Sequence, residues 1–219
     1  MEPIRYRFRF SLGPEYSVDE FVNEIGDCFD QLPDGFRIEK NVVVSALEMT
    51  EDDDLGLIRI EQKNCRLKRL EAVIPSKWVD QKTSSGDLTI ELVCDVNNDT
   101  ISVLFGPVQE ALIGRLSPYV VNIQSRGLVL YEMENRDRIG RPDLRKTHAS
   151  FASAMYFSSA TLQQYFKKTP QEFLRAITPL VYEARQISEG VFYSVNLQEL
   201  NSLDFSEFDK SMSSALGLK

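Results

Sequence analysis

The sequence predicts an α+β protein, with a mainly antiparallel sheet and packed helices in the N-terminal half and a helix-rich C-terminal half. Three observations support this. Apolar and polar residues alternate in short runs of the first half, which is typical of strands with one buried face. Helical spacing of apolar residues is clearest at residues 17–32. No helical segment separates the strand-like runs between residues 42 and 105, which favours hairpins and antiparallel pairing.

Residues 4–11 predict the first strand. Ile4, Tyr6, Phe8 and Phe10 alternate with three arginines and a serine. Successive side chains of a strand point to opposite faces, so the apolar residues share one face and the arginines share the other. The Gly-Pro pair that follows is expected to end the strand.

Residues 17–32 predict the first helix. Ser17 and Glu20 have the spacing of a capping box, in which each side chain satisfies a free backbone N–H of the first turn. The turn sequence at 33–35 is expected to end the helix. Its apolar stripe consists of Val18, Phe21, Val22, Ile25, Cys28, Phe29 and Leu32.

The remaining elements follow from shorter patterns. Strands are predicted at 42–49, 57–61, 65–74, 88–96 and 101–105. In the second half the patterns predict a helix at 108–115, a strand at 127–133, a polar loop at 134–146, helices from 161 and from 170, a strand at 191–195 and helical pieces within 197–215. No linker stands out, so one domain over 1–219 is expected. The alternative is a division into a sheet-rich part, 1–106, and a helix-rich part, 107–219.

The charge of the chain restricts its partners. The 219 residues include 33 acidic and 25 basic side chains, which gives a net charge of −8. This field repels nucleic acid and anionic membranes, and it attracts a basic partner. We therefore expect a protein partner, no nucleic acid and no membrane. The alternative explanation of the acidity is solubility alone.

Cysteine and histidine content argues against metal and disulfide chemistry. Three cysteines, Cys28, Cys65 and Cys94, form no Cys-x-x-Cys pair, and His148 is the only histidine. The acidic run at 51–54 lacks the glycine and glutamate that an EF-hand loop needs. We expect no metal and no cofactor. The first residues lack the apolar core of a signal peptide and no apolar run is long enough to span a membrane, so a cytoplasmic location is expected.

One face of the predicted helix 17–32 is the expected partner-binding site. Between residues 15 and 34 the sequence has no basic residue, so no local base is expected to neutralise this face. Like charges four residues apart repel each other, and a bound basic partner would turn that repulsion into attraction. Reversal of two of the charges is then expected to stabilise the free protein slightly. The face consists of Asp19, Glu20, Glu24, Asp27 and Asp30.

A second group of residues carries the alternative hypothesis. Arginine grips carboxylates and phosphates through two parallel hydrogen bonds, and a cluster of arginines in a loop is a candidate anion site. The residues are Arg136, Arg138, Arg141, Arg145 and His148. The alternative is a solvated loop whose cations pair with the acidic face of the same protein.

These observations favour a non-enzymatic acidic protein that binds another macromolecule. The sequence has no Gly-x-Ser-x-Gly elbow, no Gly-x-Gly-x-x-Gly and no Walker A loop. A bacterial immunity protein that neutralises a basic toxin is one concrete instance, by analogy of size, class and charge. The alternatives are an enzyme or a small-anion-binding domain that uses the loop 136–148, and a structural subunit of an oligomer.

Overall fold

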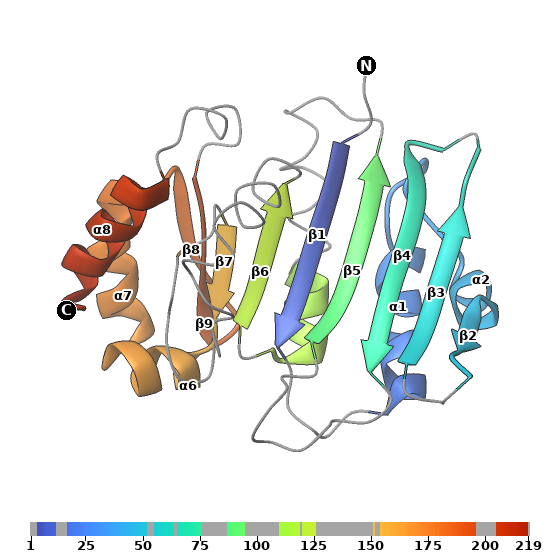
Figure 1. Cartoon of the computed structure of the whole chain (residues 1–219), viewed down its shortest axis with the longest axis horizontal. Helices are drawn as coiled ribbons and strands as arrows, with labels where there is room; N and C mark the ends of the chain where they lie inside the picture. The colour runs from blue at the N-terminus through green and yellow to red at the C-terminus, as the bar shows by residue number, and fades with distance from the viewer. Residues whose placement is uncertain are drawn as a thin grey trace. The chain divides into compact units, whose positions relative to one another are not determined.

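The computed structural model (Figure 1) describes residues 4–11, 17–51, 55–63, 65–75, 87–94, 110–118, 120–125, 151, 154–195 and 205–218. Tertiary contacts divide the chain into two compact units, Met1–Pro118 and Tyr119–Lys219. The predicted strands at 101–105 and 127–133 and the predicted loop at 134–146 lie outside the described residues. The described helices include none that is both long and apolar enough to cross a membrane.

The first unit contains an antiparallel sheet, as the alternating runs predict. Its strand order is β2-β3-β4-β5-β1, and each neighbouring pair is antiparallel. Together with the helices described below, this confirms the α+β fold class. The strands are β1 (Ile4–Ser11), β2 (Leu47–Met49), β3 (Leu55–Glu61), β4 (Leu67–Pro75) and β5 (Asp87–Cys94).

The predicted first helix is confirmed as α1 (Val18–Asp30). Ser17 caps it and forms the predicted capping box with Glu20. Figure 1 shows α1 against one face of the sheet of this unit, and the buried side of α1 includes Phe21, Ile25 and Phe29, none of which is exposed. The face of the sheet that α1 covers includes Ile58, Leu70 and Ile90, which are fully buried. Residues 110–116 form a further helical segment of this unit, close to the predicted helix at 108–115.

The prediction of a strand over residues 42–49 is wrong in its first part. Residues Lys40–Ser45 form a short helix, α2, and only Leu47–Met49 form a strand. The three successive valines within α2 favour a strand by local preference. Val43, however, is completely buried in this helical conformation. Burial of that side chain against the rest of the unit outweighs the weak local preference, which spans only about 1 kcal/mol.

The second unit contains four antiparallel strands in the order β6-β7-β9-β8. The strands are β6 (Val120–Ser125), β7 (Ala154–Phe157), β8 (Glu183–Ile187) and β9 (Gly190–Ser194). The helical segments are α6 (Ser159–Thr161), the π-helix η1 (Leu162–Phe166), α7 (Pro170–Ile177), the 3-10 turn η2 (Thr178–Leu180) and α8 (Phe205–Leu216). Helix α7 begins at the residue from which the sequence predicts a helix, and Thr169 and Glu172 form its capping box.

Three strands of this unit have no clear sequence pattern. Every residue of β7 is buried, so its side chains show no apolar–polar alternation. Strand β8 has the opposite character: it lies at the end of the strand order, and most of its side chains are partly or fully exposed. An edge strand can be polar along most of its length, because one side has no neighbouring strand to bury it. Strand β6 was likewise not predicted.

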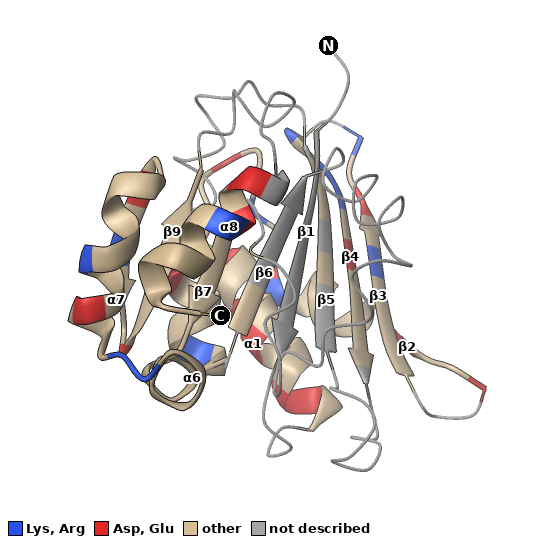
Figure 2. Ribbon diagram, turned by 60° about the vertical axis from the view of Figure 1, so that its left-hand side comes forward, with Lys and Arg blue, Asp and Glu red and all other residues tan. Residues whose placement is uncertain are grey.

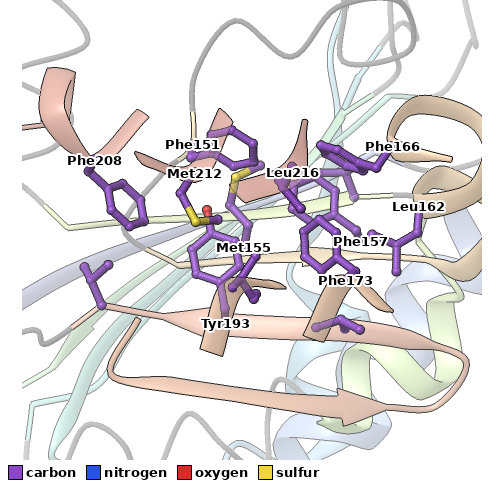
Figure 3. Close-up of a cluster of buried hydrophobic side chains, with 14 residues drawn as sticks. Phe151, Met155, Phe157, Leu162, Phe166, Phe173, Tyr193, Phe208, Met212 and Leu216 are labelled. Atoms are coloured by element: carbon purple, nitrogen blue, oxygen red, sulfur yellow. The ribbon is translucent and has the colours of Figure 1, made fainter. Parts of the chain in front are cut away.

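An aromatic cluster forms the core of the second unit (Figure 3). The ring of Phe157 lies at its centre, with centroid distances of 5.3 Å to Phe166 and 5.6 Å to Phe173, both edge-to-face. Tyr193 stacks on the same ring at 6.5 Å. The two edge-to-face pairs are favourable because the positive edge of one ring meets the negative face of the other. The cluster therefore joins β7 and β9 to η1 and α7.

A half-buried carboxylate borders this cluster. Asp209 of α8 accepts a hydrogen bond from the backbone N–H of Phe151 at 2.5 Å. Burial raises the pKa of Asp209, and the hydrogen bond opposes this shift. Burial also raises the pKa of Tyr193 well above its usual value, and the charge of Asp209 adds to that effect. The carboxylate therefore satisfies a backbone donor at the cost of partial desolvation.

Gly190 is required where β9 begins. A Cβ atom at this position would lie 2.2 Å from the carbonyl oxygen of Phe157 and 2.5 Å from the hydroxyl oxygen of Tyr156. The nearest atom belongs to the backbone of β7, so it cannot move aside as a flexible side chain could. Burial raises the pKa of Tyr156 to about 12, with a contribution from the charge of Glu189. The hydroxyl group of Tyr156 is therefore protonated at neutral pH. This side chain lies directly against the glycine.

We expect Gly190→Ala to lower the free energy of unfolding by at least about 2 kcal/mol, because overpacking of a filled site forces shifts of the backbone. The matched control is Gly114→Ala, since no atom lies within 4 Å of the Cβ position of that helical glycine. The control is expected to be neutral or to stabilise by up to about 1 kcal/mol. Urea denaturation of both variants measures the difference, and equal effects would contradict the close approach at Gly190.

The raised pKa of Asp209 predicts a specific pH dependence. A carboxyl group with a higher pKa in the folded protein stabilises the fold at low pH, and this contribution is lost as the pH rises from about 4 through the folded pKa. Asp209→Asn keeps an acceptor for Phe151 without the charge, so its stability should fall less than that of the wild type between pH 4 and pH 7. Asp209→Ala leaves the Phe151 N–H unpaired and should lose about 1–3 kcal/mol at every pH. If the stability of the wild type and that of the Asn variant change in the same way with pH, the pKa of Asp209 is not raised in the folded protein.

Candidate functional site

The five predicted partner-binding residues all lie on α1, away from its buried side. We call them the acidic face: Asp19, Glu20, Glu24, Asp27 and Asp30. Asp19 and Glu20 are exposed, whereas the other three are partly buried. Acidic residues of α1 appear in red in Figure 2. The apolar stripe and the carboxylates therefore occupy opposite sides of one helix, as the sequence predicts.

Residues 15–34 contain no base, but bases from other segments of the chain pair with this face. Arg115, from the helical segment 110–116, places its Nη1 atom 2.8 Å from Oε2 of Glu24 and 3.4 Å from Oδ2 of Asp27. Lys40 of α2 lies with its Nζ atom 2.9 Å from Oδ1 of Asp27. These cations come from segments that the fold brings to α1, so a count of charges within residues 15–34 does not include them.

A third cation pairs with the end of the acidic face. Arg37 places its Nη2 atom 2.7 Å from Oδ1 of Asp30, and its Nε–H donates to the same oxygen at 2.9 Å. This hydrogen bond is the main reason why the pKa of Arg37 is raised, and the charges of Glu39 and Asp34 add to the shift. Asp34 and Glu39 thus extend the acidic surroundings beyond the helix.

The two carboxylates in the first turn of α1, those of Asp19 and Glu20, differ in their contacts. Oε2 of Glu20 accepts a hydrogen bond from the backbone N–H of Ser17 at 2.7 Å, and this contact is the main cause of its lowered pKa. Glu20 is therefore part of the helix cap. Asp19 is exposed, and within the described part of the chain no ion pair of its carboxylate is found. Asp19 is the residue of the acidic face whose charge is most available to a partner.

The acidic face keeps a negative charge after these pairs are counted. Its five carboxylates, together with Asp34 and Glu39, outnumber Arg37, Lys40 and Arg115. The paired side chains are about one third to one half exposed, so solvent weakens each pair. The pairs therefore hold the carboxylates in defined positions without cancelling the field of the surface.

Cys28 lies on the buried side of the same helix and offers no reactive thiol. Its burial raises the pKa of the thiol to about 11, although the charge of Arg115 opposes the shift. Nucleophilic and metal-binding cysteines act as thiolates, which require a lower pKa. The burial of Cys28 agrees with the sequence-based expectation of a small core residue.

The alternative anion site is not tested by the structure. Its residues, Arg136, Arg138, Arg141, Arg145 and His148, lie outside the described residues. Asp52, Asp53 and Asp54 of the acidic run also lie outside them. Within the described part of the chain, no group of three or more histidine, cysteine or acidic side chains is placed so that it could hold a metal ion.

Comparison with known proteins gives a likeness of fold. No known protein family and no curated protein matches the sequence. Among solved structures, the chain is similar to the Pseudomonas aeruginosa T6SS protein PA0821, with a TM-score of 0.57 and 9% sequence identity. The alignment covers 98% of this chain and 72% of that protein. At this identity the likeness concerns the fold.

The ion pairs of the acidic face predict the effect of charge reversal on stability. Glu24→Lys with Asp27→Lys would place two cations beside Arg115 and Lys40, so we expect a loss of about 1 kcal/mol or more in low salt. This reverses the stabilisation expected from the sequence. Asp19→Lys is the control on the same helix, and it should cost less. Urea denaturation at low and high salt measures both variants, and high salt should reduce the difference. If Glu24→Lys with Asp27→Lys stabilises the protein, the ion pairs of Arg115 and Lys40 with these carboxylates do not contribute to its stability.

Proposed function

We propose that this chain is a non-enzymatic protein that binds a basic protein partner, and that it acts as an immunity protein against a basic toxin. The observation that carries the proposal is the acidic face of α1, whose carboxylates exceed the cations that pair with them. The net charge of −8 extends the same field over the chain. A basic partner would be attracted over a distance and would bind faster than a neutral one.

The ion pairs make the acidic face a pre-organised surface. Arg115 pairs with both Glu24 and Asp27, and Lys40 pairs with the other carboxylate oxygen of Asp27. Side chains that are already ordered lose less conformational entropy on binding. Cations of a partner would approach carboxylates whose mutual repulsion the protein has already reduced. This arrangement favours recognition of a defined pattern of lysine and arginine over a diffuse attraction.

The structural comparison supports a bacterial context for the proposal. The P. aeruginosa protein of similar fold is named as a T6SS protein. An association with the T6SS is compatible with an immunity-type protein, and we extend that association to this chain as part of the proposal. The fold by itself does not specify the function, because one fold supports many activities.

The alternative function requires the loop 136–148. An enzyme or a small-anion-binding domain would use the arginines of that loop to grip a carboxylate or phosphate. Those residues lie outside the described part of the chain, so this alternative stays a prediction. The acidic face is the better-supported site because its contacts are defined atom by atom.

The proposal predicts a location-specific effect on association. The tagged chain is used to capture a partner from the organism that encodes it, and the captured protein is purified. Asp19→Lys should slow its association severalfold at low salt, as measured by surface plasmon resonance. Glu189→Lys, in the turn of the second unit between β8 and β9, changes the net charge equally and should have little effect.

Two outcomes would contradict this proposal. Equal slowing by both variants would show that only the overall charge matters, and capture of an acidic protein or of nucleic acid would exclude a basic protein partner. The immunity role has its own readout. Expression of the captured protein should stop bacterial growth, and co-expression of the wild-type chain should restore it. Growth that is never inhibited would remove the immunity role.

A further inference from the structure

We propose that two copies of this chain associate through strand β8, by antiparallel pairing of the two β8 strands about a two-fold axis at Ala184. This inference goes beyond the proposed function and does not depend on it. It concerns the second unit alone. The pairing would continue the strand order of one copy into the strand order of the other.

Strand β8 is an edge strand whose ends are accessible. It has β9 on one side, and no other strand in the described residues pairs with it (Figure 1). Tyr182, which directly precedes the strand, is 77% exposed, and Gln186 near its end is also exposed. An edge strand presents backbone N–H and C=O groups to which another strand can add.

The hairpin turn determines which backbone groups of β8 are available. A two-residue turn joins β8 to β9, and Ile187 pairs with Gly190 across it. The residues that flank such a turn form a hydrogen-bonded pair, and hydrogen-bonded positions then alternate along the strand. Every second residue before Ile187 therefore directs its backbone groups toward β9. The residues between them direct theirs away from β9: Tyr182, Ala184 and Gln186.

Two opposite charges lie on either side of Ala184. Glu183 and Arg185 form an ion pair, with 3.0 Å between Oε1 and Nε. The guanidinium carbon of Arg185 lies 5.6 Å from the centroid of the Phe192 ring of β9, so the charged group lies over the neighbouring strand. Both side chains of the ion pair are more than one third exposed or close to it, at 40% for Glu183 and 35% for Arg185. They remain accessible to a second strand.

These charges select one register for a two-fold pair. An axis at Glu183 would place two glutamates directly opposite each other, and an axis at Arg185 would do the same with two arginines, which is unfavourable. An axis at Ala184 places Glu183 of each copy opposite Arg185 of the other. It also brings the outward backbone groups of the two strands together, with Ala184 facing its own copy as a hydrogen-bonded pair.

The strand has none of the features that prevent such pairing. Natural edge strands are often very short, or carry lysine, proline or a bulge. Strand β8 has five residues without lysine or proline, and its register with β9 is continuous. The edge strand of the first unit, β2, has only three residues. The edge at β8 is therefore the better suited to strand addition.

The charge of the second unit permits a contact between two copies. Residues 119–219 include 12 basic and 11 acidic side chains, so two second units do not repel each other strongly. A two-fold contact also uses the same surface on both copies, so each favourable pair occurs twice. A second copy thus supplies the complement of β8 without any further partner.

Exchange of charges tests the register directly. Glu183→Arg places like charges opposite each other in both side-chain pairs, and Arg185→Glu does the same with the opposite sign. Each variant alone should raise the dissociation constant of the dimer by about tenfold or more, as measured by sedimentation equilibrium of the full chain. A mixture of the two variants should form a heterodimer about as tightly as the wild type, because every arginine then faces a glutamate.

Two further variants are the controls for this experiment. Glu183→Arg combined with Arg185→Glu in one chain restores the opposite charges, so it should dimerise like the wild type. Glu51→Arg changes the net charge as much as Glu183→Arg does, but at an exposed position of the first unit, and should leave the dimer unchanged. Thermal melts establish that all variants are folded.

A backbone variant tests the strand pairing without a change of charge. Ala184→Pro removes an N–H that points away from β9, and an edge strand tolerates proline at such a position. It should weaken the dimer by about tenfold or more, because the hydrogen-bonded pair at the axis is lost. A wild-type chain that stays monomeric at every concentration measured would overturn the proposal. A dimer that persists unchanged in Ala184→Pro and in the charge variants would also overturn it, since another surface would then hold the copies together.

Discussion

Burial of the apolar stripe of α1 is the constraint on which the candidate site depends. Phe21, Ile25 and Phe29 are fully buried, and burial of side chains of this size contributes about 2–3 kcal/mol each. The capping box at Ser17 sets where the helix begins. The four-residue spacing of Phe21, Ile25 and Phe29 places them on one side of it. With that side held against the sheet, the carboxylates of the helix can only face outward. The geometry of the acidic face is thus a consequence of packing.

In the proposed function, the same side chains of the acidic face serve both stability and recognition. Glu24 and Asp27 pair with cations from two different segments, which fastens the segment 110–116 and α2 to α1. Exposed pairs of this kind contribute little energy singly, and salt weakens them. Their larger effect is to fix where the negative charge lies. A protein that binds a basic partner benefits from such fixed charges, because the order they impose is already present before binding.

The short helix α2 shows how one buried residue can decide local structure while its neighbours stay on the surface. Val43 is buried, and this contact outweighs the preference of three successive valines for a strand. The flanking valines remain on the surface. In the second unit the aromatic cluster around Phe157 has no such division, since its members are buried.

The sequence by itself determined the elements whose signals are local. The period of two at Ile4–Ser11, the capping boxes at Ser17 and Thr169 and the acidic side of α1 all depend on neighbours a few residues apart. Only the tertiary structure decided the rest. Arg115 meets Glu24 across 91 residues of sequence, and no local pattern records such a distance. Burial of both faces of β7 removed its alternation, and burial of Val43 changed a predicted strand into a helix. Contacts between distant segments outweigh weak local preferences, and they appear only once the chain has folded.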